Sequence, residues 1–208
     1  MNSLTVTSNY DSPLRREQKE ATRRRILDAA GRLMADRGLE DLSFTAIAKE
    51  AGVKERTVYR HFANKSVLLE GLWGWYQRRI NYGPIAETEE DLLQKPLRIF
   101  VGFDENEKLT RALWSSPQGR EFRLSNVEER KAGIKRAVAD ATRGLPSRQA
   151  KWLAAVIHVL YSGAAWSTMK DYWGLSGADA GRASALAIEL LLNAARENVA
   201  PIDRYRKR

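Results

Sequence analysis

Apolar residues recur at intervals of three and four along most of the chain, and no stretch alternates in the way that predicts a strand. The first helix is expected to bury Ile26, Ala30, Leu33 and Met34 and to end near Gly38. Further helices are predicted over about 65–81, 88–101, 105–115, 118–143, 147–173 and 177–198, with breaks at glycine and proline. The sequence therefore predicts an all-α fold.

Residues 43–62 hold two short helical patterns on either side of a glycine. Ser43 is suited to cap the first helix, because its hydroxyl can accept a hydrogen bond from a free amide. Gly52 is expected to turn the chain with a positive φ, and the second helix is expected to start at Glu55. At about 100° per residue, the buried residues should be Val53, Val58 and Phe62. This arrangement predicts a helix-turn-helix.

The outward face of the second helix carries groups that bind nucleic acid. Arg56 and Arg60 point away from the buried side, and arginine can bind guanine with two hydrogen bonds. Thr57 and Tyr59 flank them, and tyrosine hydroxyls commonly reach phosphate. Lys65 would add its charge to the free amides at the start of the next helix. The alternative is a helix-turn-helix used only for packing, with a solvated charged face.

The stretch GVKERTVYRHFANKSVLLEGL resembles the recognition and linker helices of the TetR family of bacterial transcriptional regulators, and the resemblance extends over residues 20–72. It implies an N-terminal three-helix helix-turn-helix domain followed by a helical-bundle domain for ligand binding and dimerisation. The DNA contacts that it implies are Ser43, Thr45, Lys54, Glu55, Arg56, Thr57, Tyr59, His61 and Lys65, to which the helical pattern adds Arg60. Two departures are Lys54, where many members have a capping serine, and Ala46, where a capping-box acid is usual.

Composition narrows the function classes. The 208 residues include no cysteine and two histidines, so we expect no metal site and no cofactor. No nucleophile–base pair or pair of carboxylates predicts an enzyme. The net charge of +9 favours a polyanionic partner, although residues 1–62 carry only 12 Lys and Arg against 9 Asp and Glu. Without an apolar run that predicts a signal peptide or membrane span, we expect a cytoplasmic protein.

Four segments follow from these patterns. We expect a disordered arm over 1–16, the helix-turn-helix domain over 17–64, the effector-binding and dimerisation domain over 65–200, and a basic tail over 201–208. The basic residues at the start of the first helix are Arg15, Arg16, Lys19, Arg23, Arg24 and Arg25. They either follow phosphates or the minor groove, or are simply solvated. The tail either touches nucleic acid or is a frayed end.

The second domain holds most of the aromatic residues, which suit an apolar ligand pocket. The candidate effector residues are Phe100, Phe103, Trp114, Phe122, His158, Tyr161 and Trp166. The alternative for each aromatic residue is core packing, and His158 could be a hydrogen-bonded core residue. The small residues at 162–165 and 183–195 would let helices meet closely in a dimer, with Trp166, Leu186, Leu190 and Ala194 as candidates. The alternative is a bundle within one chain.

Together these features favour a dimeric, DNA-binding transcriptional regulator, a repressor that a small-molecule effector releases from its operator. A twofold dimer would present two recognition helices about 34–36 Å apart, which matches successive major grooves. The alternative is a constitutive DNA-binding architectural protein that responds to no effector.

Overall fold

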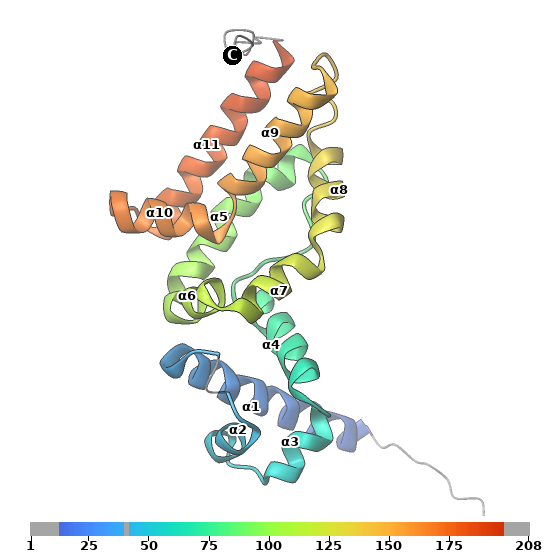
Figure 1. Cartoon of the computed structure of the whole chain (residues 1–208), viewed down its shortest axis with the longest axis vertical. Coiled ribbons are helices and arrows are strands. Elements are labelled where there is room, and N and C mark those ends of the chain that lie inside the picture. The colour runs from blue at the N-terminus through green and yellow to red at the C-terminus, as the bar shows by residue number, and fades with distance from the viewer. Residues whose placement is uncertain (1–12, 40–41, 198–208) are drawn as a thin grey trace, which may run out of the picture. The chain divides into compact units, whose positions relative to one another are not determined.

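The structure is a computed structural model that describes residues 13–39 and 42–197 (Figure 1). These residues form helices and their connections, without a strand, so the prediction of an all-α fold is confirmed. The helices are α1 (Pro13–Arg37), α2 (Phe44–Ala51), α3 (Glu55–His61), α4 (Lys65–Arg79), α5 (Glu89–Glu105), α6 (Glu107–Ser115), α7 (Pro117–Ser125), α8 (Val127–Ala137), α9 (Ser147–Leu160), α10 (Gly163–Trp173) and α11 (Gly177–Arg196).

The expected segments at the two ends of the chain can be compared with the structure only in part. The basic tail over 201–208 and most of the expected arm lie outside the described residues. Residues 13–16, which we expected to be irregular, belong to α1. A proline is compatible with this start, because the first helical residue needs no amide hydrogen and proline has the φ angle of a helix.

By its internal contacts the chain divides into two units, Met1–Leu72 and Trp73–Arg208. The sequence suggested a boundary between residues 64 and 65, whereas this division falls within α4. Consequently α4 supplies buried residues to both units. Leu68 and Leu72 belong to the first unit, while Trp75 and Tyr76 belong to the second.

The N-terminal unit packs α1 against α2 and α2 against α3. Its core includes Ile26, Ala30 and Met34 from α1, each fully buried, while Leu33 is only half-buried. Ile47 and Val58 join them from α2 and α3. Helices this short are marginal alone, so their stability comes from this shared apolar core.

In the C-terminal unit, α11 lies along α5, and α8 and α9 complete a bundle with them (Figure 1). Small residues make the contact between α5 and α11 possible. A Cβ at Gly177 would stand 2.2 Å from the carbonyl oxygen of Phe100, and one at Gly181 would stand 2.8 Å from that of Pro96. The hydroxyl of the buried Ser184 donates to the carbonyl of Leu160 at 2.6 Å. These small residues of α11 therefore serve packing within one chain.

Two of the long predicted helices are each interrupted. The stretch 118–143 divides into α7 and α8 at Asn126, and the stretch 147–173 divides into α9 and α10 at residues 161–162. Neither break coincides with glycine or proline. Ser162 instead starts a new helix, since its hydroxyl accepts a hydrogen bond from the Ala165 amide at 3.3 Å.

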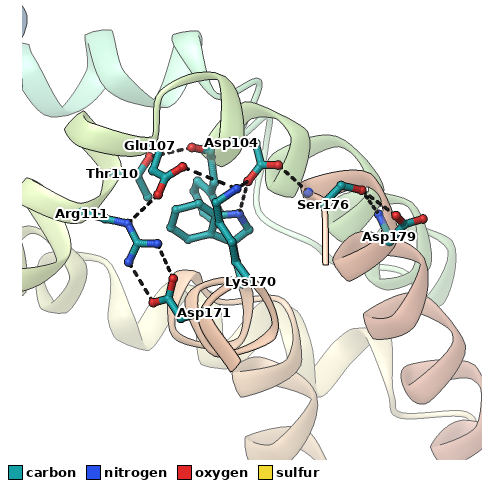
Figure 2. Close-up of polar contacts among 11 residues, drawn as sticks. Asp104, Glu107, Thr110, Arg111, Lys170, Asp171, Ser176 and Asp179 are labelled. Atoms are coloured by element: carbon teal, nitrogen blue, oxygen red, sulfur yellow. Dashed lines mark hydrogen bonds and ion pairs between the residues drawn. The ribbon is translucent and has the colours of Figure 1, made fainter. Parts of the chain in front are cut away.

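A half-buried carboxylate connects α5 to α10 and α11, as Figure 2 shows. Asp104 accepts hydrogen bonds from Trp166 Nε1 at 2.9 Å, from Lys170 Nζ at 3.1 Å and from the Gly177 amide at 2.6 Å. Arg111 bridges α6 and α10 beside it by pairing with Asp171. Trp166 is thereby held in the interior, with 1% of its surface exposed.

Candidate nucleic-acid interface and aromatic cavity

Local hydrogen bonds set the geometry of the helix-turn-helix. Ser43 caps α2 by accepting from the Ala46 amide at 3.1 Å, as predicted. Gly52 has φ +62°, and its amide and that of Val53 return to the carbonyls of Lys49 and Ala48 at 3.2 and 3.0 Å. This is a Schellman motif, in which the positive φ favours glycine.

The inner face of α3 is held by two buried residues. Val58 and Phe62 are both fully buried, whereas Val53 is only half-buried. Arg23 from α1 stacks its guanidinium 4.4 Å from the Phe62 ring centre and donates to the His61 carbonyl at 3.3 Å. Sequence reasoning grouped Arg23 with the basic residues of the first helix, and this packing role was missed because it is non-local.

The outer face of α3, which we define as Lys54, Arg56, Tyr59 and Arg60, is exposed. Tyr59 is 52% exposed, and its ring lies 4.6 Å from that of Phe44, which restricts its direction. Lys54 precedes the helix without a capping side chain, as predicted from the missing serine. The outer face therefore offers three cations and a phenol to a partner.

The other predicted DNA contacts differ in their exposure and in the hydrogen bonds that they already make. Ser43 is exposed and Thr57 is half-buried, while Thr45 donates to Glu55 Oε2 at 2.9 Å, so this pair is already engaged. His61 is half-buried; burial lowers its pKa, and the charges of Arg60, Arg23 and Lys19 lower it further. At neutral pH His61 is therefore a neutral hydrogen-bonding group.

Lys65 opens α4 and is exposed. Sequence reasoning missed the cap of this helix. The side chain of Asn64 accepts from the Val67 amide at 3.0 Å, a role typical of asparagine before a helix. The cap leaves earlier amides of the first turn available beside the lysine charge.

The C-terminal unit contains a cavity of about 240 Å³, which we call the aromatic cavity. Its lining is made of Trp73, Tyr76, Ile80, Tyr82, Phe103, Trp114, Arg123, Leu124, Val127, Arg130, His158, Tyr161, Ser162 and Gly163. Burial raises the pKa of Tyr76, Tyr82 and Tyr161, so their hydroxyls stay protonated at neutral pH. The cavity thus combines aromatic walls with a few polar groups, as ligand sites do.

Four of the seven predicted effector residues line this cavity, namely Phe103, Trp114, His158 and Tyr161. The other three lie elsewhere. Phe122 stacks on Trp73 with ring centres 5.8 Å apart, Phe100 is fully buried beside Phe103, and Trp166 is held by Asp104. Burial lowers the pKa of His158, and the charges of Arg130 and Lys131 act in the same direction.

The two lining arginines were not among the predicted residues. Arg123 and Arg130 come from α7 and α8, which sequence reasoning treated as one long helix. Their spacing of seven residues places them on a common helical face with Val127 between them, and this was the available signal. Without the fold, such a pattern is indistinguishable from a solvated basic face.

The predicted dimer residues also separate into two groups. Leu186, Leu190 and Ala194 lie at intervals of four on the exposed side of α11, with Leu186 57% and Leu190 60% exposed. Trp166 is buried within its own chain and cannot meet a partner there, which corrects that assignment. On α9, which packs against α11, the large exposed apolar residues are Trp152, Val156 and Val159.

No group of three or more His, Asp or Glu within the described residues is arranged to hold a metal ion. Within residues 13–39 and 42–197, no helix combines the length and apolar character that a membrane crossing requires.

Comparison with known proteins matches residues 26–72 to the bacterial regulatory proteins of the tetR family. The chain is 42% identical over 79 residues to the uncharacterized HTH-type transcriptional regulator YvkB of Bacillus subtilis, covering 38% of this chain and 41% of that one. It is 32% identical over 115 residues to an uncharacterized HTH-type transcriptional regulator of Haemophilus influenzae, covering 55% and 57%. The match to the HTH-type transcriptional regulator AcrR of Shigella flexneri is 40% identical over 58 residues, covering 28% and 27%.

These relatives are matched over less than two thirds of their length. Among solved structures, NalD of Pseudomonas aeruginosa, the secondary repressor of the MexAB-OprM multidrug efflux pump, superposes with a TM-score of 0.56. That match covers 82% of this chain and 95% of NalD at 18% identity. It shows a common fold and carries no information about ligands or partners.

Proposed function

We propose that the chain is a member of the TetR family, whose model matches residues 26–72. In this proposal it is a dimeric, DNA-binding transcriptional repressor that a small molecule releases from its operator. The observation that carries the proposal is the outer face of α3, where Lys54, Arg56, Tyr59 and Arg60 are exposed while Val58 and Phe62 anchor the opposite side. Acting on DNA, it would work in the cytoplasm.

In this mechanism α3 enters the major groove. Arg56 reads a base edge, since an exposed guanidinium can bind guanine with two hydrogen bonds. Tyr59 and Lys65 contact phosphates and set the position of α3 without reading sequence. The pairing of Thr45 with Glu55 holds the starts of α2 and α3 together, which keeps Arg56 in a defined direction.

Dimerisation is supported by the exposed apolar residues of α9 and α11. Val159 is 58% exposed and Leu190 is 60% exposed, on two helices that pack against each other. Large exposed apolar residues on two helices that pack together are typical of a protein interface. A second copy related by twofold symmetry would cover it with the same residues.

The aromatic cavity supports a ligand-controlled rather than a constitutive DNA-binding protein. Trp73 and Tyr76 line it, and both belong to α4, the helix whose first residue is Lys65. A ligand that displaces either ring therefore acts on the helix that carries a phosphate contact. Release follows if the ligand binds better to the conformation with low operator affinity.

The proposal is tested by selecting binding sites from random DNA at one fixed salt concentration. We expect a near-palindromic operator. Arg56→Ala should relax the preference at one position of each half-site, whereas Lys65→Ala should weaken binding to all sequences alike. Arg37→Ala, an exposed arginine at the end of α1, serves as the control. Binding without any enriched sequence would support the architectural alternative instead.

Dimerisation is tested by sedimentation of Leu190→Glu beside Leu14→Glu, a matched change at another leucine that is 63% exposed. Only the first variant should become monomeric, because it places two charges in the apolar interface. It should also lose most operator affinity, since the two half-sites are then bound independently. A Leu190→Glu protein that remains dimeric would show that the interface lies elsewhere.

A further inference from the structure

The charged groups of the aromatic cavity all have the same sign. Arg123 and Arg130 line it, together with the neutral polar residues His158 and Ser162, and none of the described lining residues is acidic. Burial lowers the pKa of Arg123, and the neighbouring charges of Arg120 and Arg130 lower it further. The site is therefore electropositive although it is walled by apolar rings.

Neither arginine has a counter-ion among residues 13–39 and 42–197. In the part of the chain that the structure describes, no carboxylate lies within 4.0 Å of the Arg123 or Arg130 guanidinium. Arg130 is only 8% exposed, and it donates to the carbonyl of Arg123 and hydrogen-bonds Tyr82. Because neutral oxygens satisfy N–H groups without neutralising charge, a buried arginine of this kind is costly until an anion reaches it.

Arg123 is held at a defined place beside the cavity. Its Nη1 donates to the Leu113 carbonyl at 2.9 Å and its Nη2 to the Trp114 carbonyl at 3.3 Å. The guanidinium lies 4.2 Å from the centre of the Trp114 ring. An anion that binds here meets a cation whose position is already restricted, so little conformational entropy is lost on binding.

The walls and the volume define the rest of the ligand. Trp73, Tyr76, Phe103, Trp114 and Tyr161 contribute ring faces and edges. The indole N–H of Trp73 is buried without a hydrogen-bond acceptor among the described residues. A cavity of roughly 150 Å³ accepts benzene, so about 240 Å³ has room for one or two rings with a small substituent.

We propose that the effector is an organic monoanion with an apolar body of one or two rings and a carboxylate that pairs with Arg123 and Arg130. This rests on the proposed function only in assigning the cavity to an effector. A cationic ligand would meet two unpaired cations and no acid. A neutral ligand would leave both arginines without a counter-ion.

The test is titration calorimetry on the full chain without DNA. The probes are 2-naphthoate, 2-naphthalenemethanol and 2-naphthalenemethylamine, which share a ring system and differ in charge, with octanoate to separate a ring from an alkyl chain. We expect 2-naphthoate to bind about tenfold or more tightly than the alcohol and the amine not to bind. Octanoate should bind more weakly than 2-naphthoate, because it cannot stack on the rings.

Substitution then identifies the cation. Arg130→Lys should retain part of the preference for the acid, and Arg130→Met should abolish it while leaving the affinity for the alcohol. Arg123→Met provides a second variant if circular dichroism shows that Arg130→Met is unfolded. Arg120→Met, at an exposed arginine of α7 that does not line the cavity, is the matched control.

Equal affinity for the three naphthalene probes, preference for the amine, or no binding by any probe would overturn the proposal. So would a preference for the acid that survives loss of both lining arginines. If octanoate bound more tightly than 2-naphthoate, the proposed ring would be refuted and the proposed anion would be supported. Operator release is measured separately by adding each probe to the DNA complex. A protein that binds 2-naphthoate without releasing DNA refutes the repressor mechanism and not the ligand class.

Discussion

Replacing Lys95 by methionine should stabilise the protein at neutral pH. Lys95 is 2% exposed, and its ammonium group donates to the Pro84 carbonyl and lies 4.1 Å from the centre of the Tyr82 ring. Burial, followed by the charge of Arg98, lowers its pKa from 10.5 to about 8, against the opposing effect of Asp91. The charged form is therefore disfavoured in the folded protein.

The pKa difference sets the magnitude. Lowering the pKa from 10.5 to about 8 corresponds to about 3 kcal/mol of lost stability while the group is charged. Because the unfolded chain binds this proton more tightly, the loss is complete below about pH 8 and diminishes as the pH rises toward 10.5. Methionine removes this cost but also removes a hydrogen bond worth about 1 kcal/mol. Lys95→Met should thus gain about 1–2 kcal/mol at pH 7.

The assay is urea unfolding followed by circular dichroism at one protein concentration, between about pH 7 and 9.5. Over this range the stability of the wild type should rise by about 2 kcal/mol relative to that of Lys95→Met. Measurements stop at about pH 9.5 because a second group affects stability above it. Burial raises the pKa of Tyr76 in the fold, so the protein loses stability once the unfolded tyrosine begins to ionise near pH 10. Lys108→Met, at an exposed lysine, is the control.

Parallel pH profiles for the wild type and Lys95→Met would refute this reasoning. So would a Lys95→Met protein that is less stable than the wild type at pH 7 by more than the value of one hydrogen bond. Parallel profiles would mean that the pKa of Lys95 is not lowered in the fold. A less stable Lys95→Met protein would mean that the contacts of Lys95 with Pro84 and Tyr82 outweigh the cost of its burial.

Three further changes probe the packing of the two units by the same unfolding assay. Gly177→Ala should cost more than about 2 kcal/mol of stability, because the new Cβ would overlap the Phe100 carbonyl. Its control is Gly144→Ala, where the new Cβ enters open space and should cost less than about 1 kcal/mol. Equal costs would contradict the close approach of α5 and α11. Asp104→Asn should lose about 2 kcal/mol, since three donors converge on this carboxylate, and an unchanged midpoint would deny it that role. Ser43→Ala should cost about 1 kcal/mol, and Ser43→Asp should restore it if capping is the cause.

The helix-turn-helix could be predicted because its information is local. Ser43 and Gly52 act on amides and carbonyls within a few residues, and Val58 and Phe62 share a face through helical spacing alone. Asn64 is also a local cap, so the sequence alone contains its signal. The break at Ser162 was missed because a capping side chain, rather than glycine or proline, starts the next helix there. The break at Asn126 has neither glycine nor proline nor a side-chain cap to mark it in the sequence.

The aromatic cavity could be predicted only in part, because its lining converges from segments far apart in the sequence. Phe103 and Tyr161 were predicted to line it, and Trp166 was predicted with them on the same grounds. Trp166 differs because its indole donates a hydrogen bond to Asp104, which lies 62 residues away in the sequence and holds the ring inside the bundle.

By itself the sequence determined that the chain is helical, the turn at Gly52 and the residues that α3 exposes, since backbone hydrogen bonds and a period of 3.6 residues depend on near neighbours. Only the tertiary structure decided that small residues of α11 pack on α5, that Leu190 remains exposed, and that Arg123 and Arg130 meet beside aromatic rings without a carboxylate. The reason is physical: burial and charge pairing depend on which side chains the fold brings together, and that is a property of the packed chain.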